Sequence, residues 1–288
     1  MIKFACCSFN FIGLDLAQSL RTIRGMGIRH ADIGVMGTDA QVNQEQATAR
    51  PEAVGTQLNE MAQEIEINLN EFFVVEVFVD GKPVRPNHPD APLRRQALEA
   101  FARLCRCARM AGCASIMGVP GSPGEGLEDE KGWALAVDML AQMVRIARDE
   151  GLVFHIEPHS GSIAQTPDLA LRLAQEVEGL RFTLDYAHFL GLNIPQQAVQ
   201  PLQAYADVLH GKPCTQGVGK TLVHEMSIDF KAIVAELLER QWQGVISMEC
   251  IWPVDTPVLT RHPTIQNAMM AHVFERALAE LEGRSLLD

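Results

Sequence analysis

The chain has 288 residues, of which 47% are hydrophobic and 21% are charged, so it can bury a full core and lacks the composition of a disordered protein. Its formal net charge of -12 repels phosphate backbones and anionic lipid surfaces, which argues against nucleic acid and membranes as partners. The sequence contains no run of about 18 apolar residues and no signal-peptide pattern near its start, so we expect a cytoplasmic protein.

Short apolar segments alternate with longer amphipathic ones along the whole chain, which is typical of repeated βα units. Eight of the short segments are predicted to be strands. They begin near Ile2, Ile28, Glu66, Cys113, Leu152, Leu180, Asp207 and Val245. Eight units in a chain of this length predict a single α/β domain over residues 1–288, closed as a (β/α)8 TIM barrel.

The segments between the strands carry helix signals and one long irregular stretch. Thr166 followed by Pro167 is a cap and first-turn proline that predicts the start of a helix. Residues 77–92, rich in proline and turn residues, predict a long loop over the C-terminal mouth of the barrel. Residues 264–281 predict a final amphipathic helix that completes the outer ring.

Two patterns that would indicate other chemistry are incomplete. The seven cysteines form no CxxC pair, which favours reduced thiols over a disulfide framework or a cysteine zinc site. Gly219-Lys220-Thr221 resembles the end of a phosphate-binding loop, but Cys214 stands where that loop needs its first glycine. We therefore expect no nucleotide site.

Four predicted strands end in a polar residue on the face that points into the barrel. Alternation along each strand places Glu157, Asp185, His210 and Glu249 in this position. Because the C-terminal ends of barrel strands surround one mouth, the four side chains are expected to converge there. Three carboxylates and one imidazole suit one divalent ion, Mn²⁺, Mg²⁺, Co²⁺ or Zn²⁺. The alternative is that each group bonds separately to loop backbone.

The segments around these residues resemble the xylose isomerase-like TIM barrel superfamily, which includes ketose 3-epimerases and hydroxypyruvate isomerase-like enzymes. The resemblance is carried by HIEPH (155–159), TLDYAH (183–188), VLHGKP (208–213), SIDF (227–230) and SMECIW (247–252). It implies metal ligation by Glu157, Asp185, His210 and Glu249, and contact of His188 with the substrate. After His210 the chain departs from the family, which has an acidic residue and a glycine-rich stretch there, so this loop gives no substrate inference.

The expected activity is a metal-dependent sugar isomerisation or epimerisation of a ketose or small hydroxy-keto compound through an enediolate. Glu157 and Glu249, expected on strands that face each other across the mouth, would form the acid/base pair. His159 follows Glu157 in the same alternation and is expected to bind substrate together with His188. His188 could instead support a metal ligand, and the sequence does not separate isomerase from epimerase.

Three other functions stay open at this point. A dehydratase or lyase acting on a related polyol or keto acid would use the same metal and carboxylates. An AP endonuclease would need further histidines from the third and fourth predicted strands, which contain none, and its DNA substrate would be repelled. A non-catalytic sugar-binding barrel would bind no metal. The expected partner is a sugar or keto acid of undetermined phosphorylation, and the resemblance adds the expectation of a homo-oligomer.

Overall fold

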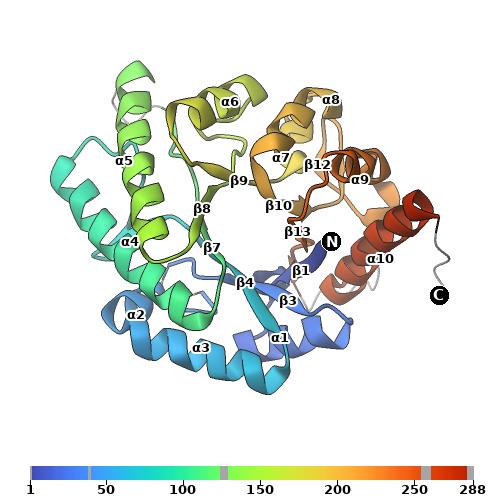
Figure 1. Ribbon diagram of the computed structural model, residues 1–288, viewed down its shortest axis with the longest axis horizontal. Helices are drawn as coiled ribbons and strands as arrows, with labels where there is room; N and C mark the ends of the chain where they lie inside the picture. Colours follow the sequence, from blue (N-terminus) through green and yellow to red (C-terminus); the bar gives the residue numbers. More distant parts are fainter. Residues whose placement is uncertain (1, 38–39, 124–128, 254–260, 284–288) are drawn as a thin grey trace.

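Eight parallel strands close into a barrel in the order β1-β13-β10-β9-β8-β7-β4-β3. The structure is a computed structural model that describes residues 2–37, 40–123, 129–253 and 261–283 (Figure 1). The barrel strands are β1 (Lys3–Cys7), β3 (His30–Gly34), β4 (Asn68–Val75), β7 (Ser115–Gly118), β8 (Val153–Ile156), β9 (Arg181–Leu184), β10 (Ala206–Gly211) and β13 (Val245–Met248). Each of the eight predicted segments supplies one of them, so the predicted (β/α)8 fold is confirmed.

Helices surround the barrel and bury their apolar faces against it (Figure 1). They are α1 (Leu16–Gly25), α2 (Gln44–Ala49), α3 (Pro51–Ile65), α4 (Ala91–Ala111), α5 (Asp129–Asp149), α6 (Pro167–Glu176), α7 (Tyr186–Gly191), α8 (Gln196–Val199), α9 (Phe230–Glu239) and α10 (Pro263–Glu282). Helix α6 begins at Pro167, and the Thr166 hydroxyl accepts a hydrogen bond from the Leu169 N–H, as expected of a cap. Within the described ranges, no helix has the length and hydropathy needed to cross a membrane.

The sequence predicted one long loop over residues 77–92, but the structure shows regular elements in this segment. Strands β5 (Val77–Val79) and β6 (Lys82–Val84) form an antiparallel hairpin that packs against α4, and α4 already begins at Ala91. The two turn residues, Asp80 and Gly81, both have positive φ, at 50° and 74°. This is the turn that an Asp-Gly pair favours, because it matches the twist of the flanking strands. A role for the hairpin at the mouth stays a prediction.

Two short strand pairs extend the C-terminal end of the barrel. Strand β2 (Phe11–Ile12) pairs in parallel with β14 (Trp252–Pro253), and β11 (Cys214–Thr215) pairs with β12 (Gly219–Lys220). The β11/β12 pair follows β10 and contacts α7. Short strands therefore continue beyond the barrel at its mouth, after β10, which contains His210, and after β13, which is followed by Glu249.

The barrel interior holds a polar layer beneath the mouth. The buried carboxylate of Glu71 accepts hydrogen bonds from the hydroxyls of Ser115 (3.0 Å) and Thr183 (2.8 Å), and it pairs with Nδ1 of His155 (2.5 Å). Nε2 of His155 lies 3.5 Å from Asp207. His155 is thus a buried, bonded core histidine one layer below Glu157. Burial opposes a charged imidazole, but the two carboxylates outweigh it and raise the pKa of His155 to about 9.

This raised pKa predicts a pH-dependent stability. The folded state keeps a proton on His155 that the unfolded chain, with its ordinary histidine pKa, loses first. The stabilisation is complete below about pH 6.5 and is lost as the pH rises through about 9. Between about pH 6.5 and 9 the free energy of unfolding, measured by urea titration, should fall with rising pH more steeply in wild type than in His155→Gln. The two slopes should differ by up to about 1.4 kcal/mol per pH unit.

The matched control is His224→Gln, because this histidine side chain is 54% exposed. It should keep the slope of the wild type. Equal slopes for His155→Gln and wild type would show that the buried imidazole is neutral.

Candidate metal centre

Four consecutive barrel strands bring the predicted ligands together. Glu157 follows β8, Asp185 follows β9, His210 lies in β10 and Glu249 follows β13. All four residues are buried, and one potential ligand atom from each lies within 4.8 Å of those of the other three. The convergence predicted from strand alternation is therefore what the fold produces. Glu157 and Glu249 are not diametrically opposed, however, because only β9 and β10 separate their strands.

Two nitrogen donors from β10 and its extension join the three carboxylates. Nδ1 of His210 lies 3.0 Å from Oε1 of Glu157 and 3.3 Å from Oε2 of Glu249. Nζ of Lys212 donates to the same Oε2 of Glu249 at 2.8 Å and to Oδ2 of Asp185 at 3.1 Å. Each carboxylate therefore touches at least one nitrogen that can carry a positive charge.

Lys212 was not among the residues predicted for the site. Its side chain is only 12% exposed, which is unusual for a lysine and is explained by the two carboxylates it meets. The signal was available in the sequence, because Lys212 lies two residues after His210 and so continues the inward alternation of Val208 and His210.

His188 completes the cluster on the outer side. Its Nε2 lies 3.4 Å from Oδ2 of Asp185 and 3.8 Å from Oε1 of Glu157. Asp185 caps α7 by accepting a hydrogen bond from the N–H of Ala187, and this places His188 one turn later on the same side. His159 lies further out, with its ring centroid 5.6 Å from that of His188. His188 thus reaches two predicted ligands, whereas no described contact joins His159 to a carboxylate of the cluster.

The surroundings keep the cluster charged. Burial by itself would raise the pKa of both glutamates. His210 nevertheless lowers the pKa of Glu157 below its usual range, and Lys212 together with His210 lowers the pKa of Glu249 well below its usual range. Burial likewise opposes the cations, yet Glu249 raises the pKa of His210, and Asp185 with Glu249 raises that of Lys212. Three carboxylates face these two cations, so the site retains a demand for positive charge.

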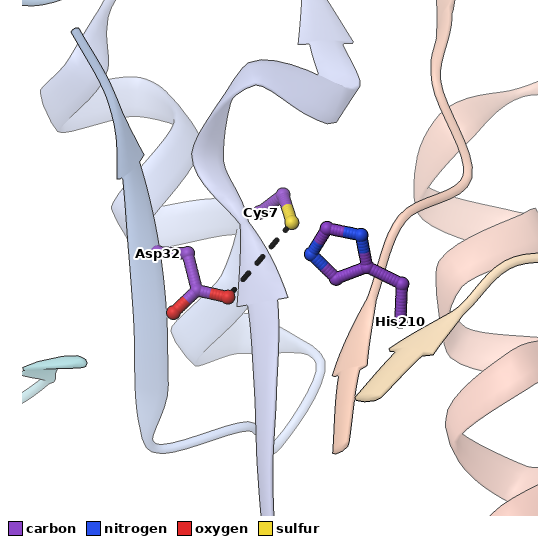
Figure 2. Close-up of side chains that lie close together, drawn as sticks. All are labelled: Cys7, Asp32 and His210. Carbon is purple, nitrogen blue, oxygen red and sulfur yellow. Dashed lines mark hydrogen bonds between the residues drawn. The ribbon is translucent and has the colours of Figure 1, made fainter. Parts of the chain in front are cut away.

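A second group of side chains lies behind His210. Figure 2 shows one ring nitrogen of His210 directed toward the sulfur of Cys7, with Asp32 on the other side of the thiol. The Cys7 thiol lies 3.9 Å from Oδ2 of Asp32 and 3.5 Å from the hydroxyl of Ser247, and Nε2 of His210 has no hydrogen-bond partner among the described residues. The ring of Phe73 stacks on His210 with centroids 5.9 Å apart. These contacts hold the imidazole so that Nδ1 faces the carboxylates.

The donor set fits a divalent metal ion. Carboxylate oxygens with one imidazole nitrogen are ligands that Mn²⁺, Mg²⁺, Co²⁺ and Zn²⁺ accept. The four side chains are held rigidly at the ends of barrel strands, and an ion would supply the positive charge that three buried carboxylates require. The second group, Cys7, Asp32 and His210, also has its donor atoms within 4.8 Å of one another but is fully buried.

Comparisons with known proteins agree with this architecture. A sequence model described as "Xylose isomerase-like TIM barrel" matches residues 21–270. A D-tagatose 3-epimerase-like protein is similar in structure, with 18% identity, coverage of 98% of this chain and 99% of the other, and a TM-score of 0.75.

Two further solved structures extend the comparison. The IOLI protein with a binding zinc atom has 17% identity, coverage of 97% and 99%, and a TM-score of 0.74. The probable 3-DHS dehydratase AsbF from Bacillus anthracis has 13% identity, coverage of 95% and 99%, and a TM-score of 0.70. No curated protein sequence matches the chain. At these identities the structural similarities establish the fold.

The thiols around the site are predicted to be inert. Burial raises the pKa of Cys7 to about 12, and all seven cysteines are buried and free. At about pH 8 a thiol reagent such as DTNB should therefore find no fast-reacting cysteine in the folded chain and seven in denaturant. Ala204→Cys, at an exposed position, is the positive control and should add one fast thiol. A fast thiol in the folded wild type would contradict the buried arrangement behind His210.

Proposed function

Because the chain belongs to the xylose isomerase-like TIM barrel family, we propose that it is a divalent-metal-dependent sugar isomerase or epimerase that works through an enediolate. The observation that carries the proposal is the convergence of three buried carboxylates and one imidazole at the C-terminal mouth. Catalytic groups of this fold lie at that end of the barrel. The expected substrate is a ketose or a small hydroxy-keto compound.

The proposed ligands are Glu157, Asp185, His210 and Glu249. When bound, a divalent ion would polarise a substrate carbonyl and stabilise the negative charge that develops on its oxygen. The protein's own contribution is to hold the four donors in place. His210 is fixed between the stacked ring of Phe73 and the group around Cys7, so its Nδ1 keeps facing Glu157 and Glu249.

Glu157 and Glu249 are the proposed acid/base pair. Both carboxyl groups are held in their ionised form, which a base needs in order to accept a proton from the carbon next to a carbonyl. They come from strands separated by two others, and we propose that they reach a bound substrate from different directions. Return of the proton to the same carbon from the opposite side gives an epimer, and return to the neighbouring carbon gives an isomer.

The two histidines at the rim are proposed to bind substrate oxygens. His188 is 24% exposed in its side chain and lies next to two of the carboxylates, so it can donate a hydrogen bond to a substrate hydroxyl in the mouth. His159 lies beside it, one step further from the centre. Because His188 is nearer to the carboxylates than His159, we expect His188 to contact the reacting part of the substrate and His159 to contact a more distant hydroxyl.

A dehydratase is the second candidate, and Lys212 is the observation that favours it. Loss of water needs a proton donor for the departing hydroxyl, in addition to the base that removes the neighbouring proton. The Lys212 ammonium, 2.8 Å from Glu249, lies within reach of the same site and can donate a hydrogen bond to the departing hydroxyl. Both reactions begin with the same proton removal. They differ in the next step, which is return of a proton to carbon in the isomerase or epimerase and loss of a hydroxyl as water in the dehydratase.

The proposal predicts metal content and proton exchange that depend on the carboxylates. Wild-type protein should contain or take up close to one divalent ion per chain and exchange deuterium from D₂O into a ketose or hydroxy-keto acid. Glu157→Gln and Glu249→Gln should lower exchange at least about 100-fold, because each removes a proton acceptor. Elemental analysis and proton NMR provide the two measurements.

Glu225→Gln is the matched control, since this side chain is 55% exposed and lies outside the cluster. It should keep metal content and exchange. Deuterium entry without loss of water supports the isomerase or epimerase, whereas water release identifies the dehydratase. Failure of wild-type protein to bind a divalent ion after reconstitution would refute the proposed metal centre and leave a non-catalytic barrel.

A further inference from the structure

Lys212 is the residue at the centre of the cluster whose role the metal hypothesis does not explain. Its ammonium bonds to Asp185 and Glu249, two of the four proposed ligands. A bound ion would have to approach the same two carboxylates at about 2.0–2.3 Å. Two cations cannot share these oxygens at such distances without strong mutual repulsion.

The position of Lys212 in the barrel places its ammonium between the two carboxylates in the metal-free protein. The residue directly follows β10, whose neighbours in the barrel are β9, which leads to Asp185, and β13, which leads to Glu249. Its side chain therefore extends between the two carboxylates and donates a hydrogen bond to each of them. The lysine stem is flexible, so the ammonium can turn away while the backbone stays in place.

We propose that Lys212 is an internal competitor for the metal ion, which holds Asp185 and Glu249 in the metal-free protein and is displaced when the ion binds. This inference rests on the proposed metal centre. Displacement has two consequences. The metal-free site stays folded with its carboxylates compensated, and the affinity for the ion is lower than the four ligands alone would give. The freed ammonium then becomes a cation available at the mouth.

The opposite role is equally well defined. Lys212 could instead orient Asp185 and Glu249 for the ion. The two roles predict opposite effects of removing the ammonium. Metal binding becomes weaker if Lys212 orients the ligands and stronger if it competes with the ion.

The test is calorimetric titration of Mn²⁺ and of Zn²⁺ into the metal-free full-length protein at about pH 8, comparing wild type with Lys212→Met. Methionine keeps a stem of similar length and removes the charge. Removing a competitor that makes two hydrogen bonds to charged groups should lower the Kd at least about 10-fold. The metal-induced rise in Tm should also be larger in the variant.

Lys220→Met is the matched control. Lys220 is a lysine of the same loop, but its ammonium bonds to the backbone oxygen of Ile251 and lies over the ring of Trp252. Its removal should leave the Kd unchanged. If Lys212→Met does not fold without metal, Lys212→Gln replaces it, because the amide can still hydrogen-bond to the two carboxylates without carrying charge.

An unchanged or higher Kd in the Lys212 variant, with metal binding in wild type, overturns the competition and leaves the proposed function standing. A lower Kd in the Lys212 variant alone supports it. Absence of binding in both proteins refutes the metal centre itself, and the competition with it.

Discussion

Three carboxylates buried within a few ångströms of one another repel strongly, and the structure of the mouth follows from how that repulsion is offset. Asp185 and Glu249 come from the two strands that flank β10, and β10 supplies both His210 and, in its extension, Lys212. One strand thus places two cationic side chains between its neighbours' anions. Three carboxylates face two cations, so the charge balance is incomplete, and the proposed divalent ion would complete it.

The same principle governs the layers around the mouth. Below it, Glu71 is buried but bonded to two hydroxyls and to His155. Behind it, Asp32 accepts hydrogen bonds from Asn70 and from the backbone N–H of Glu71. These polar contacts cost desolvation and return little net stability, but they fix the orientation of the groups above them. The barrel interior is therefore a rigid polar support for the mouth as well as part of the core.

The fold itself does not select the reaction. Proteins described as an epimerase-like protein, a zinc-binding protein and a probable dehydratase share this barrel at 13–18% identity. Because one fold serves different functions, the side chains at the strand ends must select among them. In this chain these side chains include Lys212, whose ammonium bonds to Asp185 and Glu249 and whose charge we propose to affect the retention of an ion.

The barrel and the four converging residues could be predicted from the amino-acid sequence, because both depend on local periodicity. Hydrophobic segments at regular spacing gave eight strands, and alternation within a strand tells which side chain points inward. The same rule applied one step further includes Lys212, and the Asp80-Gly81 pair was a hairpin signal within a segment predicted as loop.

Which side chains touch could not be predicted from local patterns, because it depends on how the barrel closes. Cys7 and Asp32 carry no motif, and they meet His210 because β1 and β3 lie near β10 once the barrel closes. Glu71 reaches His155 across the interior in the same way, from a strand 84 residues away. The separation of Glu157 and Glu249 by two strands, rather than across the full mouth, is likewise a property of the closed sheet. Alternation fixes the direction of each side chain, but the curvature and register of the closed barrel fix the distances between them.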